Sequence, residues 1–165
     1  SNSFRCLHVL EGHTDWVRSL CQLSPSTFAS GSDDKTIRVW DSNSFRCLHV
    51  LEGHIGYVLS LCQLGPSTFG SGSWDKTIRV WESNPFRCLH VLEGHAHCVW
   101  SLCQLSPSTF ASGSGDWTIR VWDSNSFRCL HVLEEHTGPV YSLCVSPSQG
   151  LLLSGSGDGT VRVWR

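Results

Sequence analysis

The sequence has 165 residues and lacks the features of three large classes of protein. No apolar run approaches the roughly 20 residues that span a bilayer, so we expect no membrane association. Basic residues are not in excess, because 12 Lys and Arg stand against 14 Asp and Glu, for a net charge of −2. A nucleic-acid-binding protein needs a basic surface to displace phosphate counterions, so we expect no nucleic-acid partner. Residues 1–6 lack the basic start and apolar stretch of a secretory signal.

Methionine is absent, whereas eight Trp, nine Cys, nine His and fifteen Gly are present. Such a skewed composition in a short chain indicates internal repetition. The sequence Ser-Asn-X-Phe-Arg-Cys-Leu-His-Val-Leu-Glu starts at positions 1, 42, 83 and 124. The chain therefore consists of four units, residues 1–41, 42–82, 83–123 and 124–165, and the first two units differ at eight positions. We expect one repeat domain over residues 1–165.

Each unit contains four short runs with the composition of β-strands. In the first unit these are residues 4–10, 17–23, 27–32 and 36–40, and turn sequences such as Gly-His, Ser-Pro and Asp-Asp-Lys lie between them. No stretch offers ten residues with the 3.6-residue period of an amphipathic helix. The sequence predicts an all-β fold with four short strands in each unit.

Two dipeptides recur at a fixed spacing in these units. In the first three units, Gly-His is followed about 27 residues later by Trp-Asp or Trp-Glu: Gly12-His13 by Trp40-Asp41, Gly53-His54 by Trp81-Glu82, and Gly94-His95 by Trp122-Asp123. The fourth unit departs from this pattern, with Glu135-His136 and Trp164-Arg165. On these motifs the whole chain resembles the WD-repeat β-propeller family. The resemblance implies a propeller of antiparallel four-stranded blades, with four blades per chain.

The resemblance also implies a hydrogen-bonded tetrad of His, Ser, Asp and Trp in every blade. The matching residues are His13, Ser30, Asp34 and Trp40; His54, Ser71, Asp75 and Trp81; His95, Ser112, Asp116 and Trp122; and His136, Ser154, Asp158 and Trp164. In such a set a carboxylate fixes the imidazole tautomer and the indole N–H finds a buried acceptor. We interpret the tetrads as structural.

Ser, His and Asp together also compose the catalytic triad of hydrolases. That reading is rejected here because the set recurs in every unit, whereas an enzyme needs one site. The Gly-x-Ser-x-Gly turn of α/β-hydrolases is absent as well. We therefore predict no catalytic residues and a protein that is not an enzyme.

Eight of the nine cysteines occupy two repeated positions in the units, and Cys98 is the ninth. An odd number of cysteines without a secretory signal predicts free thiols in a reducing compartment, so we expect a cytoplasmic protein. Cys6 and His8 lie on one strand face, as do the equivalent pairs in the other units, but two ligands do not complete a zinc site. We predict no metal and no cofactor. His8 and its three equivalents are interpreted as half-buried or solvated edge residues.

In the family, the first strand of each unit is the outermost strand of the preceding blade. Residues 4–10 would then be an outer strand without a blade, and residues 140–164 a blade without an outer strand. An unpaired sheet edge promotes aggregation, so we expect the two to pair. One chain could close as a four-bladed ring, or two chains could exchange strands and close an eight-bladed ring. We favour the eight-bladed homodimer; another multimer, or a piece of a larger protein, stays open.

The units differ mainly after Gly-His and around the tetrad Asp. In the family, both clusters lie on one face of the disk, the usual binding surface, which is called the top face below. The top face would carry Trp16, Arg18, Tyr57, Leu59, Trp74, Cys98, Trp100, Trp117 and Tyr141. Neutral drift would bring Lys, Glu, Ser and Asn, whereas exposed Trp, Tyr and Arg are typical of interfaces. We predict a non-catalytic scaffold that binds a protein or peptide through this face.

Two alternatives remain open at this point. The chain could be an engineered or excised repeat unit that assembles blades without a selected ligand. An enzyme would need the unrepeated polar residues Asp15, Arg18, Asp33 and His97 to converge in one pocket.

Overall fold

The computed structural model describes residues 3–165, and it is built of antiparallel β-sheets. The described residues form three four-stranded sheets and one three-stranded sheet. In every sheet, neighbouring strands are also consecutive in the sequence. The first contains β1 (Val17–Ser24), β2 (Thr27–Ser32), β3 (Ile37–Asp41) and β4 (Cys47–Leu51). The second contains β5 (Val58–Gly65), β6 (Thr68–Ser73), β7 (Ile78–Ser83) and β8 (Phe86–Leu92). The third contains β9 (Val99–Ser106), β10 (Thr109–Ser114), β11 (Ile119–Asp123) and β12 (Cys129–Leu133). The last contains β13 (Val140–Ser146), β14 (Leu151–Ser156) and β15 (Val161–Trp164).

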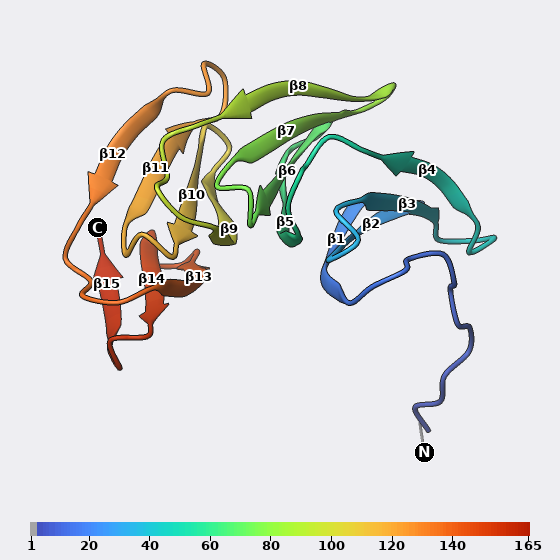
Figure 1. The fold of residues 1–165 in the computed structure, drawn as a ribbon, viewed down its shortest axis with the longest axis horizontal. Coiled ribbons are helices and arrows are strands. Elements are labelled where there is room, and N and C mark those ends of the chain that lie inside the picture. Colours follow the sequence, from blue (N-terminus) through green and yellow to red (C-terminus); the bar gives the residue numbers. More distant parts are fainter. Residues whose placement is uncertain (1–2) are drawn as a thin grey trace.

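The sheets are the blades expected from the repeats. They stand side by side along an open arc, with the N-terminal segment at one end and β15 at the other (Figure 1). Hydrophobic clusters fill the junctions between successive sheets, and the innermost strands β1, β5, β9 and β13 contact one another along the arc. The core is therefore divided into three junctions, and each buries the apolar faces of two neighbouring blades.

A glycine on the second strand of each of the first three blades allows the next blade to approach closely. A Cβ atom placed on Gly31 would lie 2.6 Å from Cγ1 of Val58, and one on Gly72 would lie 2.7 Å from Cγ1 of Val99. Val58 and Val99 are fully buried by this contact. The repeated Ser-Gly-Ser sequence is thus a packing requirement of the junction, since any side chain at the glycine would push the blades apart.

The predicted strands match those of the structure with one exception. Residues 17–23, 27–32 and 36–40 correspond to β1, β2 and β3, and the repeats of residues 4–10 form β4, β8 and β12. Residues 4–10 themselves form no strand, and their Phe4, Leu7 and Val9 side chains are exposed. The expected pairing of this segment with the last blade is therefore not seen, and the arc is not closed. The physical reason is distance, since β15 lies at the far end of the arc (Figure 1).

Candidate interaction site

The tetrads form the same hydrogen-bonded chain in all four blades. In the second blade, His54 Nδ1 lies 2.7 Å from Asp75 Oδ2, and His54 Nε2 lies 2.7 Å from Ser71 Oγ. The indole N–H of Trp81 donates to the same Ser71 oxygen over 2.8 Å. A carboxylate only accepts, so Nδ1 carries the proton and Nε2 accepts from the serine hydroxyl.

The equivalent distances in the other blades lie between 2.7 and 2.8 Å. The structure therefore brings each of the four predicted sets together. The imidazoles are buried and each set joins three separate segments of its own blade. This arrangement fixes the blade and contains no feature that distinguishes one set as a reactive site.

Each tetrad aspartate also organises two turns. Asp34 Oδ1 accepts from the backbone N–H and the hydroxyl of Thr36, and Oδ2 accepts from the backbone N–H of Thr14. Burial alone would raise the pKa of Asp34, but the bonds from Thr36 and His13 outweigh it and lower the pKa to about 2. The tetrad thereby fixes the segment after Gly-His, in which the repeats differ.

The pKa values of the other tetrad aspartates also lie below their ordinary value. For Asp75 and Asp116, burial is again outweighed, mainly by hydrogen bonds from the tetrad histidine and the following threonine. For Asp158 the hydrogen bond from Thr160 is the largest cause. The carboxylates are thus held in the charged form that the imidazoles require.

Four aromatic side chains form a continuous row across the second, third and fourth blades. Ring centroids are 5.9 Å apart between Tyr57 and Trp74, 5.7 Å between Trp74 and Trp100, and 5.4 Å between Trp100 and Tyr141. Tyr57, Trp74 and Tyr141 are 40%, 47% and 50% exposed. Edge-to-face and tilted contacts of this kind hold the rings in place while leaving part of each ring in water. These four residues are called the aromatic row below.

The first blade carries charge at the equivalent position. Nε and Nη2 of Arg18 donate to the buried carboxylate of Asp33, and the Nε contact to Oδ1 is 2.9 Å. The guanidinium also lies 4.6 Å from the ring centre of Trp16, which is 68% exposed. The first blade therefore presents a cation, Arg18, and an aromatic ring, Trp16, whose relative orientation is fixed by their mutual contact and by Asp33. This pair is called the Arg18 corner below.

Two of the predicted surface residues are not at the surface. Leu59 is buried at the start of β5, and Cys98 is almost fully buried, with its sulfur 3.0 Å from His97 Nδ1. Because both side chains are buried, neither is exposed on the top face as the sequence predicted. Trp117 is exposed as expected, on the turn between β10 and β11.

The unrepeated polar residues do not converge. Arg18 and Asp33 pair with each other in the first blade, whereas His97 lies in the third blade beside Cys98 and Trp74. Among residues 3–165, no group of three or more His, Cys, Asp or Glu side chains is arranged to hold a metal ion. All nine cysteines are free thiols.

An aromatic contact between successive repeat units was not predicted from the sequence. His8, His49 and His90 each stack on a phenylalanine of the next unit, with ring centroids 4.2 to 4.7 Å apart. The partners are Phe45, Phe86 and Phe127. The constant spacing of 37 residues between each His and Phe was the signal available in the sequence.

Comparisons with known proteins agree with this geometry. A family model described as WD domain, G-beta repeat matches residues 4–41, 45–82, 86–123 and 127–165. The chain belongs to the WD-repeat family. Within residues 3–165, no helix is long and apolar enough to cross a membrane.

The similar curated WD-repeat proteins match over about one repeat. Protein transport protein sec13 of Aspergillus clavatus is 46% identical over 46 residues, which cover 26% of this chain and 16% of that protein. Pre-mRNA-splicing factor PRP46 of Eremothecium gossypii is 48% identical over 40 residues, covering 23% and 9%. Mitochondrial division protein 1 of Saccharomyces cerevisiae is 56% identical over 36 residues, covering 22% and 5%. The matched segment thus spans no more than 16% of the length of each of these relatives.

Proposed function

We propose that this chain is a non-catalytic scaffold that binds a protein or peptide through its top face. The aromatic row is the observation that carries the proposal. It is the largest set of partly exposed rings in mutual contact in the described chain, and it lies where the otherwise near-identical repeats differ. Exposed tryptophan and tyrosine contribute much of the energy of protein interfaces, and a cluster of them in water is unusual without a partner.

The charge of this surface indicates what it would bind. The row itself contains no charged side chain, and the one ion pair at the equivalent positions, Arg18 with Asp33, is internally neutralised. A partner would therefore be recognised mainly by apolar and aromatic contact, with a polar anchor at the Arg18 corner. An extended peptide segment that crosses several blades fits a surface that follows the arc.

The relatives give coarser support for the same proposal. These relatives are named for protein transport, pre-mRNA splicing and mitochondrial division, so similar repeats occur in proteins of unrelated processes. Fold does not determine function, so the partner has to be read from the site. Free thiols in a chain without disulfides support a cytoplasmic location as part of this proposal.

We also propose that the scaffold is a homodimer in which two four-bladed arcs close one eight-bladed ring. The three-stranded last blade and residues 4–10, which pair with none of the sheets, support it, since the blade lacks an outer strand and residues 4–10 lack a strand to pair with. A closed ring would display two aromatic rows related by two-fold symmetry, and a repetitive partner would gain avidity.

The binding proposal is tested by selecting peptides from a random displayed library on the purified protein. We expect an enriched sequence class whose binding weakens at least about tenfold in Trp74→Ala and Trp100→Ala. Ile55→Ala is the matched control, because Ile55 is 81% exposed and stands outside the row. Enriched peptides that bind equally to all three variants, or no enrichment at all, would refute the role of the aromatic row; the second result would favour a repeat unit without a ligand.

A further inference from the structure

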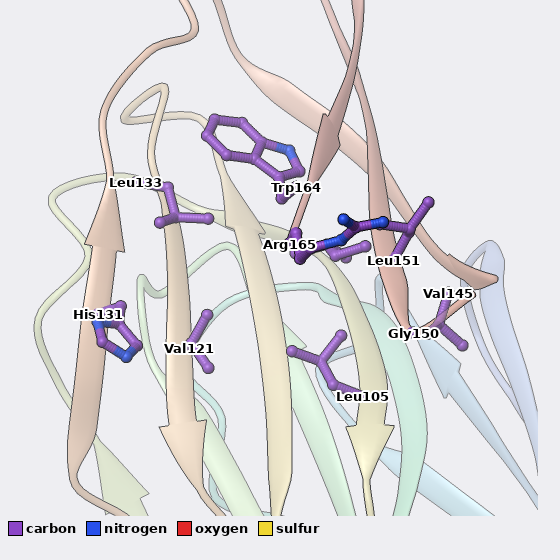
Figure 2. Close-up of a pocket in the computed structure, with 10 residues that line it drawn as sticks. Leu105, Val121, His131, Leu133, Val145, Gly150, Leu151, Trp164 and Arg165 are labelled. Carbon is purple, nitrogen blue, oxygen red and sulfur yellow. The ribbon is translucent and has the colours of Figure 1, made fainter. Parts of the chain in front are cut away.

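A cavity of about 370 Å³ lies between the third and fourth blades, next to the C-terminus. His131 and the apolar side chains of the third blade form one wall, and Trp164 and Leu151 belong to the other (Figure 2). Four of the lining positions recur at all three junctions between blades. They are a leucine of the innermost strand, a valine of the third strand and a leucine of the outer strand of one blade, and the tetrad tryptophan of the next blade. Here they are Leu105, Val121, Leu133 and Trp164.

At the other two junctions a phenylalanine occupies this place. Phe86 packs against the first cluster, whose equivalent members are Leu23, Val39, Leu51 and Trp81. Phe127 packs against the second, whose equivalent members are Leu64, Val80, Leu92 and Trp122. Each phenylalanine also stacks on the histidine equivalent to His131, over 4.7 Å and 4.5 Å. The cavity is therefore lined as a phenylalanine site, and it accepts the phenylalanine of a Phe-Arg-Cys-Leu-His-Val-Leu strand.

One copy of this segment pairs with no sheet of the described chain. Residues 4–10 have the same sequence as residues 45–51, which include β4, yet Phe4 is fully exposed. In the first blade, β4 pairs with β3 in the register Ile37 with Leu51 and Val39 with His49. The same register on the free edge of β15 would pair Val161 with Leu10 and Val163 with His8. Val161 and Val163 are 74% and 61% exposed, so this edge is open.

The outward-facing side of the first blade is also complementary to the outward-facing side of the fourth blade. Val17 and Leu20 are 51% and 67% exposed, although their equivalents in the other three blades are buried. The equivalents of Val17 each cover the glycine of the preceding blade, and the last such glycine, Gly155, is uncovered. Its nearest neighbour for an added Cβ is Ser142 of its own blade, at 3.9 Å.

These observations identify the occupant. The strand β1, which carries Val17, and residues 4–10 lie at one end of the arc, whereas β14, which carries Gly155, and β15 lie at the other (Figure 1). Residues of β14 and β15 line the cavity. Since the ends of one arc are apart, the complement is available on another copy. We propose that the end of the fourth blade is a docking site for a second copy of this chain, which inserts Phe4 into the cavity, adds residues 4–10 to β15 and seats Val17 on Gly155. This assigns the contacts of the proposed homodimer and is independent of the aromatic row.

The test is the particle mass by light scattering at micromolar concentration for the intact chain and two variants. We expect two chains per particle for the wild type. Phe4→Asp changes a fully exposed side chain, and a Cβ added at Gly155 in Gly155→Val lies no closer to its own chain than 3.9 Å from Ser142, an ordinary van der Waals distance. Each substitution acts at both junctions of the ring, so we expect each to raise the half-assembly concentration at least about 30-fold while leaving the lone chain folded.

Gly113→Val is the matched control, because a Cβ at Gly113 would lie 2.8 Å from Cγ1 of Val140 in the same chain. It should lower the melting temperature of the chain itself, which Gly155→Val should not. A one-chain mass for the wild type, particles larger than two chains, or a two-chain mass that survives either variant would overturn the proposal. Peptide binding by the aromatic row is judged separately, from the loss of binding in Trp74→Ala at an unchanged particle mass. The docking proposal can therefore fail while the binding proposal holds, and the reverse.

Discussion

Replacement of Ser112 by alanine tests how the tetrad stabilises a blade. The Ser112 hydroxyl is fully buried and lies 2.7 Å from His95 Nε2 and 2.8 Å from Trp122 Nε1. The substitution removes one oxygen and leaves both ring nitrogens buried without a partner. Each unsatisfied buried group costs about 1–3 kcal/mol, so we expect a loss of about 2–6 kcal/mol in the free energy of unfolding. Urea unfolding followed by tryptophan fluorescence and by circular dichroism measures it.

Ser124→Ala is the matched control for that experiment. The Ser124 hydroxyl is also buried, but it forms no hydrogen bond within the described residues. Its removal should leave the free energy of unfolding unchanged or raise it slightly, because no partner is left unsatisfied. If Ser112→Ala costs no more than Ser124→Ala, the tetrad does not stabilise the blade in the way argued here.

Three further predictions follow from side chains of known environment. The pKa of Asp34 is about 2 in the folded state against an ordinary 3.8, so the stability that Asp34 contributes is complete above pH 3.8 and is lost as the pH falls toward 2. The urea midpoint of the wild type should therefore fall over that pH range, and it should fall less steeply in Asp34→Asn. A midpoint that does not change with pH would contradict this prediction. Burial raises the pKa of Cys62 to about 12, so at pH 8 it should react with a disulfide reagent at least about 100-fold more slowly than exposed Cys129, as mass spectrometry of labelled peptides would reveal. Arg18→Ala should lower the urea midpoint of unfolding, because it leaves the buried carboxylate of Asp33 without the guanidinium that donates to it; an unchanged midpoint would show that the pair contributes nothing to stability.

The blades were predictable from the sequence because the strand pattern, the turn residues and the motif spacing of each repeat unit all indicate the same structure. The alternation in residues 36–40, the turn at Asp34 and the spacing from His13 to Trp40 all indicate the same four-stranded unit. Repetition in register turns a weak dipeptide signal into a specific one. Repetition did not single out the tetrad partners, because most positions are shared by the near-identical units; they were predicted from the resemblance to the WD-repeat family.

The surface was less predictable because burial depends on neighbours that a pattern does not specify. Leu59 and Cys98 vary between the units like their exposed neighbours, yet both side chains are buried. The stacking of His49 on Phe86 joins two units and was hidden in a segment read as solvated edge. Residues 4–10 show the limit most clearly, since the same seven residues form part of a blade at 45–51 and no strand at 4–10. Strand formation requires a partner edge, which is a property of the assembly.

Amide hydrogen exchange of residues 4–10 tests the central claim of the account most directly. Residues 45–51 have the same sequence and serve as an internal reference, and peptides extended to Trp16 or Tyr57 tell the two segments apart. At micromolar concentration the account predicts that residues 4–10 are protected like residues 45–51 and lose this protection on dilution. Rapid exchange of residues 4–10 at every concentration, beside a protected β4, would contradict it.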